Sequence, residues 1–253
     1  MTNTSVLVLT SLLSASALLA QEPAESPGAE RPITLKQFPL DILRQQKPIF
    51  TFPGQVVRGR HWKPVLAVAI GTAALIALDP YTEPFFRNRS TFDSYQTGPL
   101  RGRNTTLAVS LTPAVFYVAG LASHSTKSKN TGLLAAEALV DTQLVSFVMK
   151  QAAGRLAPSE IPRGGNFRDT WFKYEGSFTN RGSFPSGHTA SSFAVATVIA
   201  ERYRKHRWVP YAAYGTAAVL SLSRLPTRAH FASDIFIGAA MGYSISHFVV
   251  LPR

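Results

Sequence analysis

The amino-acid sequence predicts an all-α fold, a bundle of six helices, and three observations carry this prediction. Apolar segments with few charges recur from residue 64 onwards, separated by polar loops. Alternating patterns typical of strands are weak throughout the chain. Proline and glycine gather between the apolar segments, where helices are expected to end. The six expected helices are residues 64–78, 105–122, 133–149, 189–200, 209–222 and 231–250.

The composition limits the class of protein. The chain has 253 residues and no cysteine, which excludes disulfides, thiolate catalysis and cysteine-based zinc sites. A net charge of +12 favours phosphate-rich partners and, equally, the basic loops of a membrane protein. Only 16% of the residues are charged, and no RNA-binding signature or Cys/His finger occurs. We therefore expect no nucleic-acid partner.

The chain divides into three parts along its length. Residues 1–20 are apolar, end in small residues and precede a polar break, which is typical of a signal peptide or of an uncleaved membrane anchor. Residues 21–63 form a Pro-bearing basic leader, expected to be extended because six prolines interrupt it. Residues 64–253 form the helical domain, and this length suits a single domain.

Two acidic residues interrupt the third expected helix. Glu137 and Asp141 are four residues apart, so they share one helix face. They are either buried and functional or directed at a polar groove, and we expect the groove. Most of the apolar segments are shorter than the about 20 residues needed to cross a membrane. They are therefore either short tilted spans or core helices of a globular bundle.

The segment 223–234 carries the first set of reactive side chains. His230 and Asp234 are four residues apart at the start of the last expected helix and share a face. A carboxylate in this position fixes the imidazole tautomer and leaves the other ring nitrogen free as a nucleophile or base. Arg224, at the end of the preceding helix, offers a planar fork of donors to phosphate oxygens. Any one of these residues alone would be an ordinary structural residue, but together they indicate a phosphate site.

The P-S-G-H sequence at residues 185–188 opens the fourth expected helix. Backbone N–H groups at a helix N-terminus bind anions, and Gly187 allows an anion to approach closely. Ser186 is either a plain N-cap or a further donor. His188, in the first turn, can protonate a leaving oxygen.

Three segments in order resemble the motifs of the type 2 phosphatidic acid phosphatase and vanadium haloperoxidase superfamily. The family's pattern is K-x6-R-P, then P-S-G-H, then S-R-x5-H-x3-D. The second and third motifs match in full at residues 185–188 and 223–234. The first motif begins with Lys150, but Ala157 stands where the family has its arginine, and Arg155 lies two residues earlier.

This resemblance implies metal-independent hydrolysis of a phosphoester through a phosphohistidine. His230 would attack phosphorus, Asp234 would orient His230, and His188 would protonate the leaving alcohol and then activate water. Five residues would hold the phosphoryl oxygens: Lys150, Arg155, Ser186, Gly187 and Arg224. The expected substrate is a lipid phosphate or diphosphate, such as phosphatidate or a polyprenyl diphosphate, in a membrane. No metal or other cofactor is expected.

The same residues are compatible with two other functions. Haloperoxidases of this superfamily bind vanadate in the same cage, and vanadate would then be the cofactor. A non-enzymatic phosphate- or lipid-binding protein of the cell envelope would account for Ala157, unless another arginine supplies the missing contact. The arginines considered for this role are Arg155, Arg163, Arg168 and Arg181.

The distribution of charge predicts the side of the membrane that the site faces. The three motifs lie at one end of the expected bundle, and the basic turn 201–208 lies at the other. Positively charged loops tend to stay in the cytoplasm, so we expect the site to face the periplasm. The expected location is a bacterial-type cell envelope, either in the inner membrane or as a soluble periplasmic globule.

Overall fold

A computed structural model describes residues 33–92, 98, 100–162, 164–173 and 182–252 of the chain. The described residues form seven α-helices and no strand, which confirms the all-α prediction, although six helices were expected. The helices are α2 (Phe38–Val57), α3 (Trp62–Arg87), α5 (Gly102–Ala122), α6 (Thr126–Ala153), α7 (Gly187–Arg202), α8 (Trp208–Leu222) and α9 (Ala232–Ile245). Short 3₁₀ turns occur at Ser90–Phe92 and Pro158–Glu160, and α9 continues into a π-helical turn at Ser246–Val250. The expected signal peptide or anchor lies outside the described residues.

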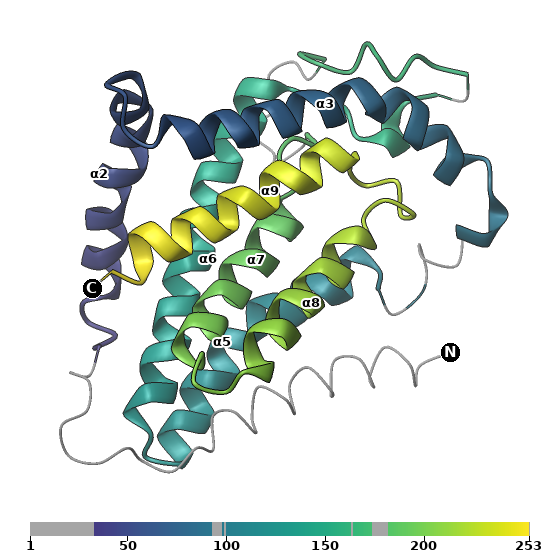
Figure 1. The fold of residues 1–253 in the computed structure, drawn as a ribbon. Coiled ribbons are helices and arrows are strands. Elements are labelled where there is room, and N and C mark those ends of the chain that lie inside the picture. Colours follow the sequence, from purple (N-terminus) through teal and green to yellow (C-terminus); the bar gives the residue numbers. More distant parts are fainter. Residues whose placement is uncertain (1–32, 93–97, 99, 163, 174–181, 253) are drawn as a thin grey trace.

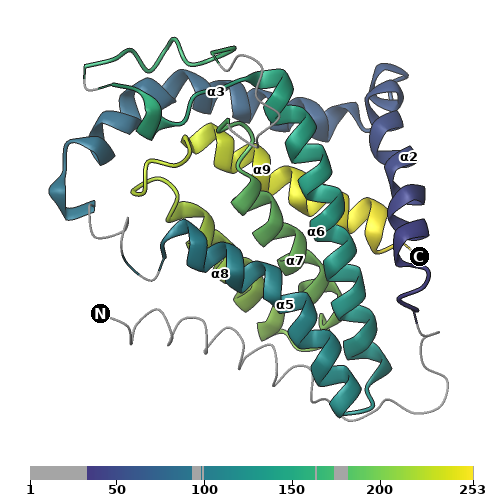
Figure 2. The same cartoon turned by 180° about the vertical axis from the view of Figure 1, so that it is seen from behind.

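Helix α7 occupies the centre of the bundle. It packs between α6 and α8, and α9 crosses it (Figure 1). Helix α5 lies along α6, and α2 flanks the bundle beside α6, as the view from behind shows (Figure 2). Helix α3 packs on α9. This arrangement brings the end of α6, the start of α7 and the loop between α8 and α9 to the same end of the bundle.

Helices α7 and α9 pack so closely that two positions of α9 have no room for a side chain. A Cβ atom built on Gly242 would lie 2.1 Å from the carbonyl oxygen of Ala190, and one built on Gly238 would lie 2.7 Å from that of Ser186. Both distances are well below van der Waals contact, so the packing requires glycine at both positions. Ala190 and Ala194 of α7 are completely buried here. The close approach fixes the separation of the first turns of the two helices.

The apolar core lies toward the other end of α7. Tyr203, just after α7, packs its ring 5.8 Å from that of Phe116 in α5, and both side chains are fully buried. Val198 of α7 is also completely buried in this cluster. Burying one large apolar side chain stabilises a fold by about 1.5–3 kcal/mol, so this cluster anchors the bundle away from its polar end.

Helix α2 corrects the expectation of an extended leader. The prolines predicted to prevent a helix are present, but Pro48 and Pro53 lie inside α2. Each proline removes one backbone hydrogen bond and disfavours the helix locally. Contacts with α6, formed only in the folded chain, offset that cost. The prediction that residues 21–63 are extended throughout is therefore wrong.

The acidic pair of α6 makes those contacts with α2. The side-chain amide of Gln45 donates to Glu137 at 2.9 Å, and that of Gln46 donates to Asp141 at 2.6 Å. Both carboxylates are completely buried. The expectation that Glu137 and Asp141 face a polar groove is therefore wrong, because α2 covers both side chains.

Helix α3 extends further than its apolar pattern indicates. The polar loop expected from residue 79 begins only after Arg87, because α3 continues through Pro80 and Pro84. Asp79 and Glu83 lie in this extension and are buried. Proline and charge predict a break at this point, but tertiary partners for Asp79, described below, stabilise the longer helix.

Four segments of the described chain are long and apolar enough to cross a membrane. They are α3, α5, the segment Thr126–Glu160 that contains α6, and the segment Ala232–Val250 that contains α9. The helices extend beyond the apolar runs, so the short length of those runs is no obstacle to spanning. Their outer faces expose large apolar side chains, among them Leu66, Ile70, Leu111, Val118 and Val148. A surface of this kind fits a lipid environment.

The substitution Gly242→Ala tests the close approach of α7 and α9. The added methyl group would meet the backbone of Ala190, so we expect a destabilisation of about 1–3 kcal/mol, typical of overpacking. Thermal unfolding of the purified protein in detergent measures this change. Gly215→Ala in α8 is the matched control, because a Cβ atom there meets nothing within 4 Å. An unfolding temperature for Gly242→Ala equal to that of the wild type would contradict the required contact.

Candidate active site

A cavity of about 770 Å³ lies at the end of the bundle where α6 ends and α7 begins. Its wall includes four of the residues that the motifs select, Lys150, Gly187, His188 and His230. Ala157, the position at which the first motif departs from its pattern, also lines it. Most of the remaining wall comes from α5 and α6. These four motif residues therefore line one shared space.

Two histidines face this cavity from neighbouring helices. His188 stands in the first turn of α7, and His230 directly precedes the N-cap of α9. Their ring centroids are 6.3 Å apart, and the ring planes are tilted by 59°. The close packing of α7 on α9 brings them together. The two rings are near enough to act on the same small group.

His230 is held by a backbone carbonyl. Its Nδ1 atom lies 2.8 Å from the carbonyl oxygen of Ser183 and 3.7 Å from Oδ2 of Asp234. Because a carbonyl only accepts, Nδ1 must carry the hydrogen, and the neutral ring then has a lone pair on Nε2. Burial lowers the pKa of His230 below its ordinary value, which favours this neutral ring. The sequence assigns the orienting contact to Asp234, and the structure gives the closer contact to Ser183.

Asp234 lies directly behind this ring and is completely buried. Its Oδ2 atom accepts a hydrogen bond from the backbone N–H of Phe231 at 2.9 Å, as acidic residues in the first turn of a helix commonly do. Its Oδ1 atom accepts from the guanidinium of Arg155 at 2.6 Å. The carboxylate is therefore fixed on both sides and stays close to His230.

Ser186 is the N-cap of α7. Its hydroxyl oxygen accepts hydrogen bonds from the backbone N–H of Thr189 at 3.4 Å and from the Thr189 hydroxyl at 3.0 Å. The plain N-cap role considered from the sequence is thus present. Gly187 follows at the cavity wall, where an added Cβ atom would lie 3.3 Å from the hydroxyl of Ser146. Phosphate contacts of Ser186 and Gly187 stay predictions.

Lys150 and Arg224 bring positive charge to the same region. The ammonium group of Lys150 donates to the carbonyl oxygen of Gly182. The guanidinium of Arg224 donates to the carbonyl oxygen of Leu100 and to the hydroxyl of Ser223, the latter at 2.8 Å. Burial lowers the pKa of Arg224 to about 10, so this side chain is still a cation at neutral pH.

Arg155 lies away from the cavity that Lys150 and Gly187 line. Its guanidinium is buried behind Asp234 and donates to Asp234, Ser233, Asp79 and Thr170. It does not line the cavity. The structure thus gives the guanidinium of Arg155 other partners, and its predicted phosphate contact stays a prediction.

Two side chains at the cavity were not predicted from the sequence. The Thr106 hydroxyl of α5 lies 2.6 Å from Nε2 of His188. Gln143 of α6 donates to the carbonyl oxygen of Gly187 at 3.1 Å and to the Ser191 hydroxyl at 2.5 Å. Gln143 lies seven residues before Lys150, two helical turns away on the same face, which is a signal that could have identified it. Thr106 carries no signal of this kind in the sequence.

Burial and neighbouring charges determine the pKa of His188. Burial lowers the pKa of His188 from 6.5 to about 4, and His230, Arg224 and Lys150 contribute to the same direction. The ring is therefore neutral at pH 7. An anion in the cavity would favour the protonated ring, because an opposite charge nearby raises the pKa of histidine.

The other arginines that could replace the missing motif residue are only partly described by the structure. Arg163 and Arg181 lie outside the described residues. Arg168 donates to the hydroxyl of Tyr81 at 2.7 Å and packs on that ring. Within the part of the chain that the structure describes, no group of three acidic or histidine side chains could hold a metal ion.

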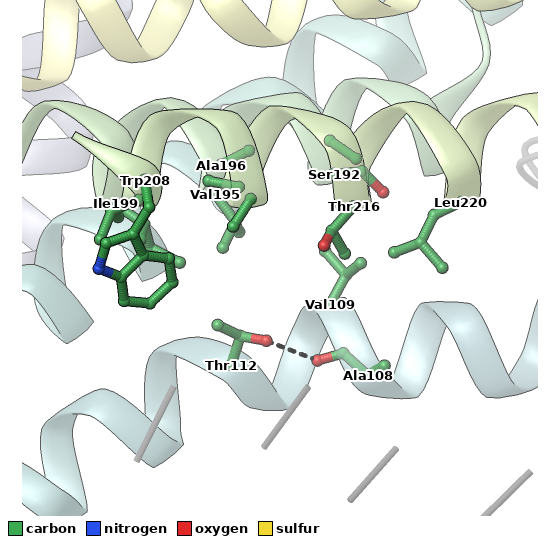
Figure 3. A pocket seen from close by; sticks show the side chains of 14 residues that line it. Ala108, Val109, Thr112, Ser192, Val195, Ala196, Ile199, Trp208, Thr216 and Leu220 are labelled. Carbon is green, nitrogen blue, oxygen red and sulfur yellow. Dashed lines mark hydrogen bonds between the residues drawn. The ribbon is translucent and has the colours of Figure 1, made fainter. Parts of the chain in front are cut away.

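An apolar crevice adjoins the cavity. It has a volume of about 110 Å³ and lies between α5, α7 and α8. Figure 3 shows its length, with Trp208 at one end and Ser192 and Leu220 at the other. Val109, Ser192 and Leu220 line both the crevice and the cavity. The apolar crevice and the cavity are thus neighbours along α7.

Comparison with known families agrees with this geometry. Residues 131–251, which hold all three motif segments, match the model of the PAP2 superfamily. The resemblance to the type 2 phosphatidic acid phosphatase superfamily is thereby confirmed for these residues. No solved structure matches the chain.

Three characterised relatives act on lipid A, according to their names. A lipid A 1-phosphatase of Porphyromonas gingivalis is 32% identical over 96 residues, which is 38% of this chain and 21% of that protein. A lipid A 4'-phosphatase of the same organism is 28% identical over 118 residues, 47% of this chain and 48% of that protein. A lipid A 1-phosphatase of Rhizobium etli is 32% identical over 107 residues, 41% of this chain and 42% of that protein. The matched regions span at most about half the length of these relatives.

Proposed function

We propose that this protein is a phosphatase that hydrolyses a phosphorylated lipid. The observation that carries the proposal is the arrangement of His230, held with Nε2 unprotonated, opposite His188 across one cavity. Lys150 lines the same cavity, and Arg224 lies beside His188. A nucleophile, an acid and two cations around one space suit transfer of a phosphoryl group.

The proposed mechanism uses protein groups alone. The lone pair on Nε2 of His230 forms a bond to phosphorus, while the bond from phosphorus to the lipid oxygen breaks. His188, protonated in the presence of the phosphate anion, gives its proton to the leaving oxygen. His188 then takes a proton from water, whose oxygen attacks phosphorus and releases phosphate from His230. Asp234 stabilises the positive charge that His230 carries while it is phosphorylated.

Three features support a lipid as the substrate. The apolar crevice along α7 continues from the cavity and could hold part of a hydrocarbon chain. Four segments have the length and composition of membrane spans. The relatives are named as lipid A phosphatases. The proposed substrates are therefore lipid phosphates or diphosphates, including phosphatidate, polyprenyl diphosphates and lipid A.

A second candidate is a non-enzymatic protein that binds phosphate or lipid. The specific observation in its favour is Ala157, which lines the cavity where the family motif has an arginine. Loss of one charge-assisted contact to a phosphoryl oxygen weakens transition-state stabilisation by about 2.7–4 kcal/mol when a comparable donor is removed from an oxyanion site. Turnover would then be slow while phosphate binding is retained.

We also propose that the protein lies in the inner membrane with the cavity on the periplasmic side. The basic residues of the turn that joins α7 to α8 support this orientation. That turn lies at the opposite end of α7 from His188. Its cations are Arg202, Arg204, Lys205 and Arg207.

His230→Ala tests the proposed activity. The purified wild type should release phosphate from a panel of lipid phosphates in detergent, and His230→Ala should lose at least about 1000-fold in kcat because the nucleophile is absent. His206→Ala, at the other end of the molecule, is the matched control and should retain full activity. Full activity in His230→Ala would reject the mechanism. Bromination that depends on vanadate and peroxide would instead indicate a haloperoxidase.

Ala157→Arg tests whether the departure from the motif limits turnover. An added guanidinium at the cavity wall should raise kcat by about 10- to 100-fold, because it supplies a further cation to the phosphoryl oxygens. Phosphate release measures the effect, with Ala157→Leu as a control for size alone. An unchanged kcat would mean that the existing cations already suffice.

Single-cysteine labelling tests the orientation, and the absence of native cysteine makes it direct. Lys205→Cys should react with a membrane-impermeant maleimide only after the cells are opened. Gly98→Cys, close in sequence to Leu100 at the cavity end, should react in cells whose outer membrane alone is permeabilised. The reverse pattern would place the cavity in the cytoplasm.

A further inference from the structure

A buried ion network lies behind the candidate nucleophile. Arg155 is 1% exposed, and its guanidinium reaches two fully buried carboxylates. One Nη atom donates to Asp234 at 2.6 Å, and the other donates to Asp79 at 2.8 Å. The Nε atom donates to the hydroxyl of Thr170 at 3.3 Å. All three nitrogens of the guanidinium are therefore engaged by protein oxygens.

Ser233 ties the two carboxylates together. Its hydroxyl accepts a hydrogen bond from Arg155 at 2.7 Å and donates one to Asp79. Its backbone N–H also donates to Asp79, at 3.3 Å. Since Ser233 directly precedes Asp234 in the first turn of α9, Asp79 holds that turn at two points.

Aromatic rings fix the plane of the guanidinium. The central carbon of Arg155 lies 4.0 Å from the ring centroid of Phe231 and 4.5 Å from that of Trp171. Stacking of this kind suits the flat guanidinium and not the compact ammonium of lysine. The network thus uses the geometry of arginine as well as its charge.

The main chain of Arg155 is also connected to His230 by hydrogen bonds. Its carbonyl oxygen accepts from the backbone N–H of Ser183 at 2.8 Å. The carbonyl oxygen of Ser183 in turn lies 2.8 Å from Nδ1 of His230. His230 is therefore reached from Arg155 by two routes, one through Asp234 and one through Ser183.

We propose that Arg155 and Asp79 are positioning residues that act on His230 through Asp234, and that Arg155 is not a ligand of the phosphate. Asp79 belongs to α3, outside residues 131–251 that match the superfamily, so α3 completes the site from beyond the matched region. The effect on turnover rests on the proposed phosphatase function. The effect on the state of His230 does not.

The physical basis is the cost of a buried charge. Arg155, Asp79 and Asp234 are removed from water, and each is stable there because its hydrogen bonds are satisfied by the others. Removing one partner leaves another buried and poorly paired, and Asp234 can then move relative to His230. A misplacement of about 1 Å at a reacting group can cost about 100-fold in rate.

The first experiment compares Asp79→Asn and Arg155→Lys with the wild type in phosphate release and in inhibition by inorganic phosphate. Both variants should lose about 100-fold in kcat. The KM and the inhibition constant of phosphate should stay within about twofold of the wild type, because phosphate does not contact either residue. Asp169→Asn and Arg44→Lys, which change the exposed members of two other ion pairs, are the matched controls and should keep wild-type kcat.

Two results would overturn the proposal. A kcat equal to that of the controls would show that the network does not position the nucleophile. A phosphate inhibition constant weakened about tenfold in Arg155→Lys, with kcat retained, would instead make Arg155 a phosphate ligand. If either variant fails to fold, Ser233→Ala removes the bridge without uncovering a charge and should lower kcat in the same direction.

A second experiment does not depend on turnover. Nitrogen-15 NMR of labelled histidines reports the tautomer and pKa of His230, whose signal is identified by its loss in His230→Ala. The charged and titratable groups that face His230 are Asp234, Lys150 and His188. Asp234 raises the pKa of His230 through its hydrogen bond and charge, so a displaced Asp234 in Asp79→Asn should lower that pKa, with no shift in Asp169→Asn.

An unshifted His230 signal in Asp79→Asn would overturn the proposal even in an active enzyme. A wild type that hydrolyses no phosphate ester, combined with the expected shift, would reject the phosphatase function and leave the positioning network intact. The two failures are thus separable.

Discussion

The backbones of α7 and α9 meet at Gly238 and Gly242, and the rest of the site depends on that contact. Helix α7 begins at the P-S-G-H turn, and α9 begins beside the second histidine. With side chains between the helices, the two histidine rings would be further apart than 6.3 Å. The packing of two small-residue surfaces therefore sets the spacing of the two histidines.

A second constraint is the burial of charge near that contact. Asp234 cannot be left alone in the interior, so its position requires a cation, and Arg155 supplies one. The guanidinium in turn requires a second carboxylate, which comes from Asp79. This requirement explains why α3 stays helical past its apolar run and why it packs on α9. The ion pairs of Arg155 with Asp234 and with Asp79 therefore connect the site to α3.

Much of the site is visible in the sequence because its parts are local. His230 and Asp234 share a helix face by their spacing, and the P-S-G-H turn identifies a helix start. The helices α5 to α9 follow the apolar segments of the sequence, with errors mainly at their ends. The helix over residues 38–57 was not predicted, since Pro48 and Pro53 oppose it locally and the amides that dock it on α6 act only across the fold. Asp79 was assigned to a loop for the same reason.

The sequence by itself determined the helical class, the resemblance to the superfamily and the candidate reactive side chains, because each depends on short-range spacing. Only the tertiary structure decided what those side chains contact. It placed Arg155 behind Asp234 instead of at the cavity wall, and it gave the hydrogen bond of His230 to the carbonyl of Ser183. These outcomes depend on which distant segments compete for the same donor or acceptor. The spacing of residues along the chain does not reveal that competition.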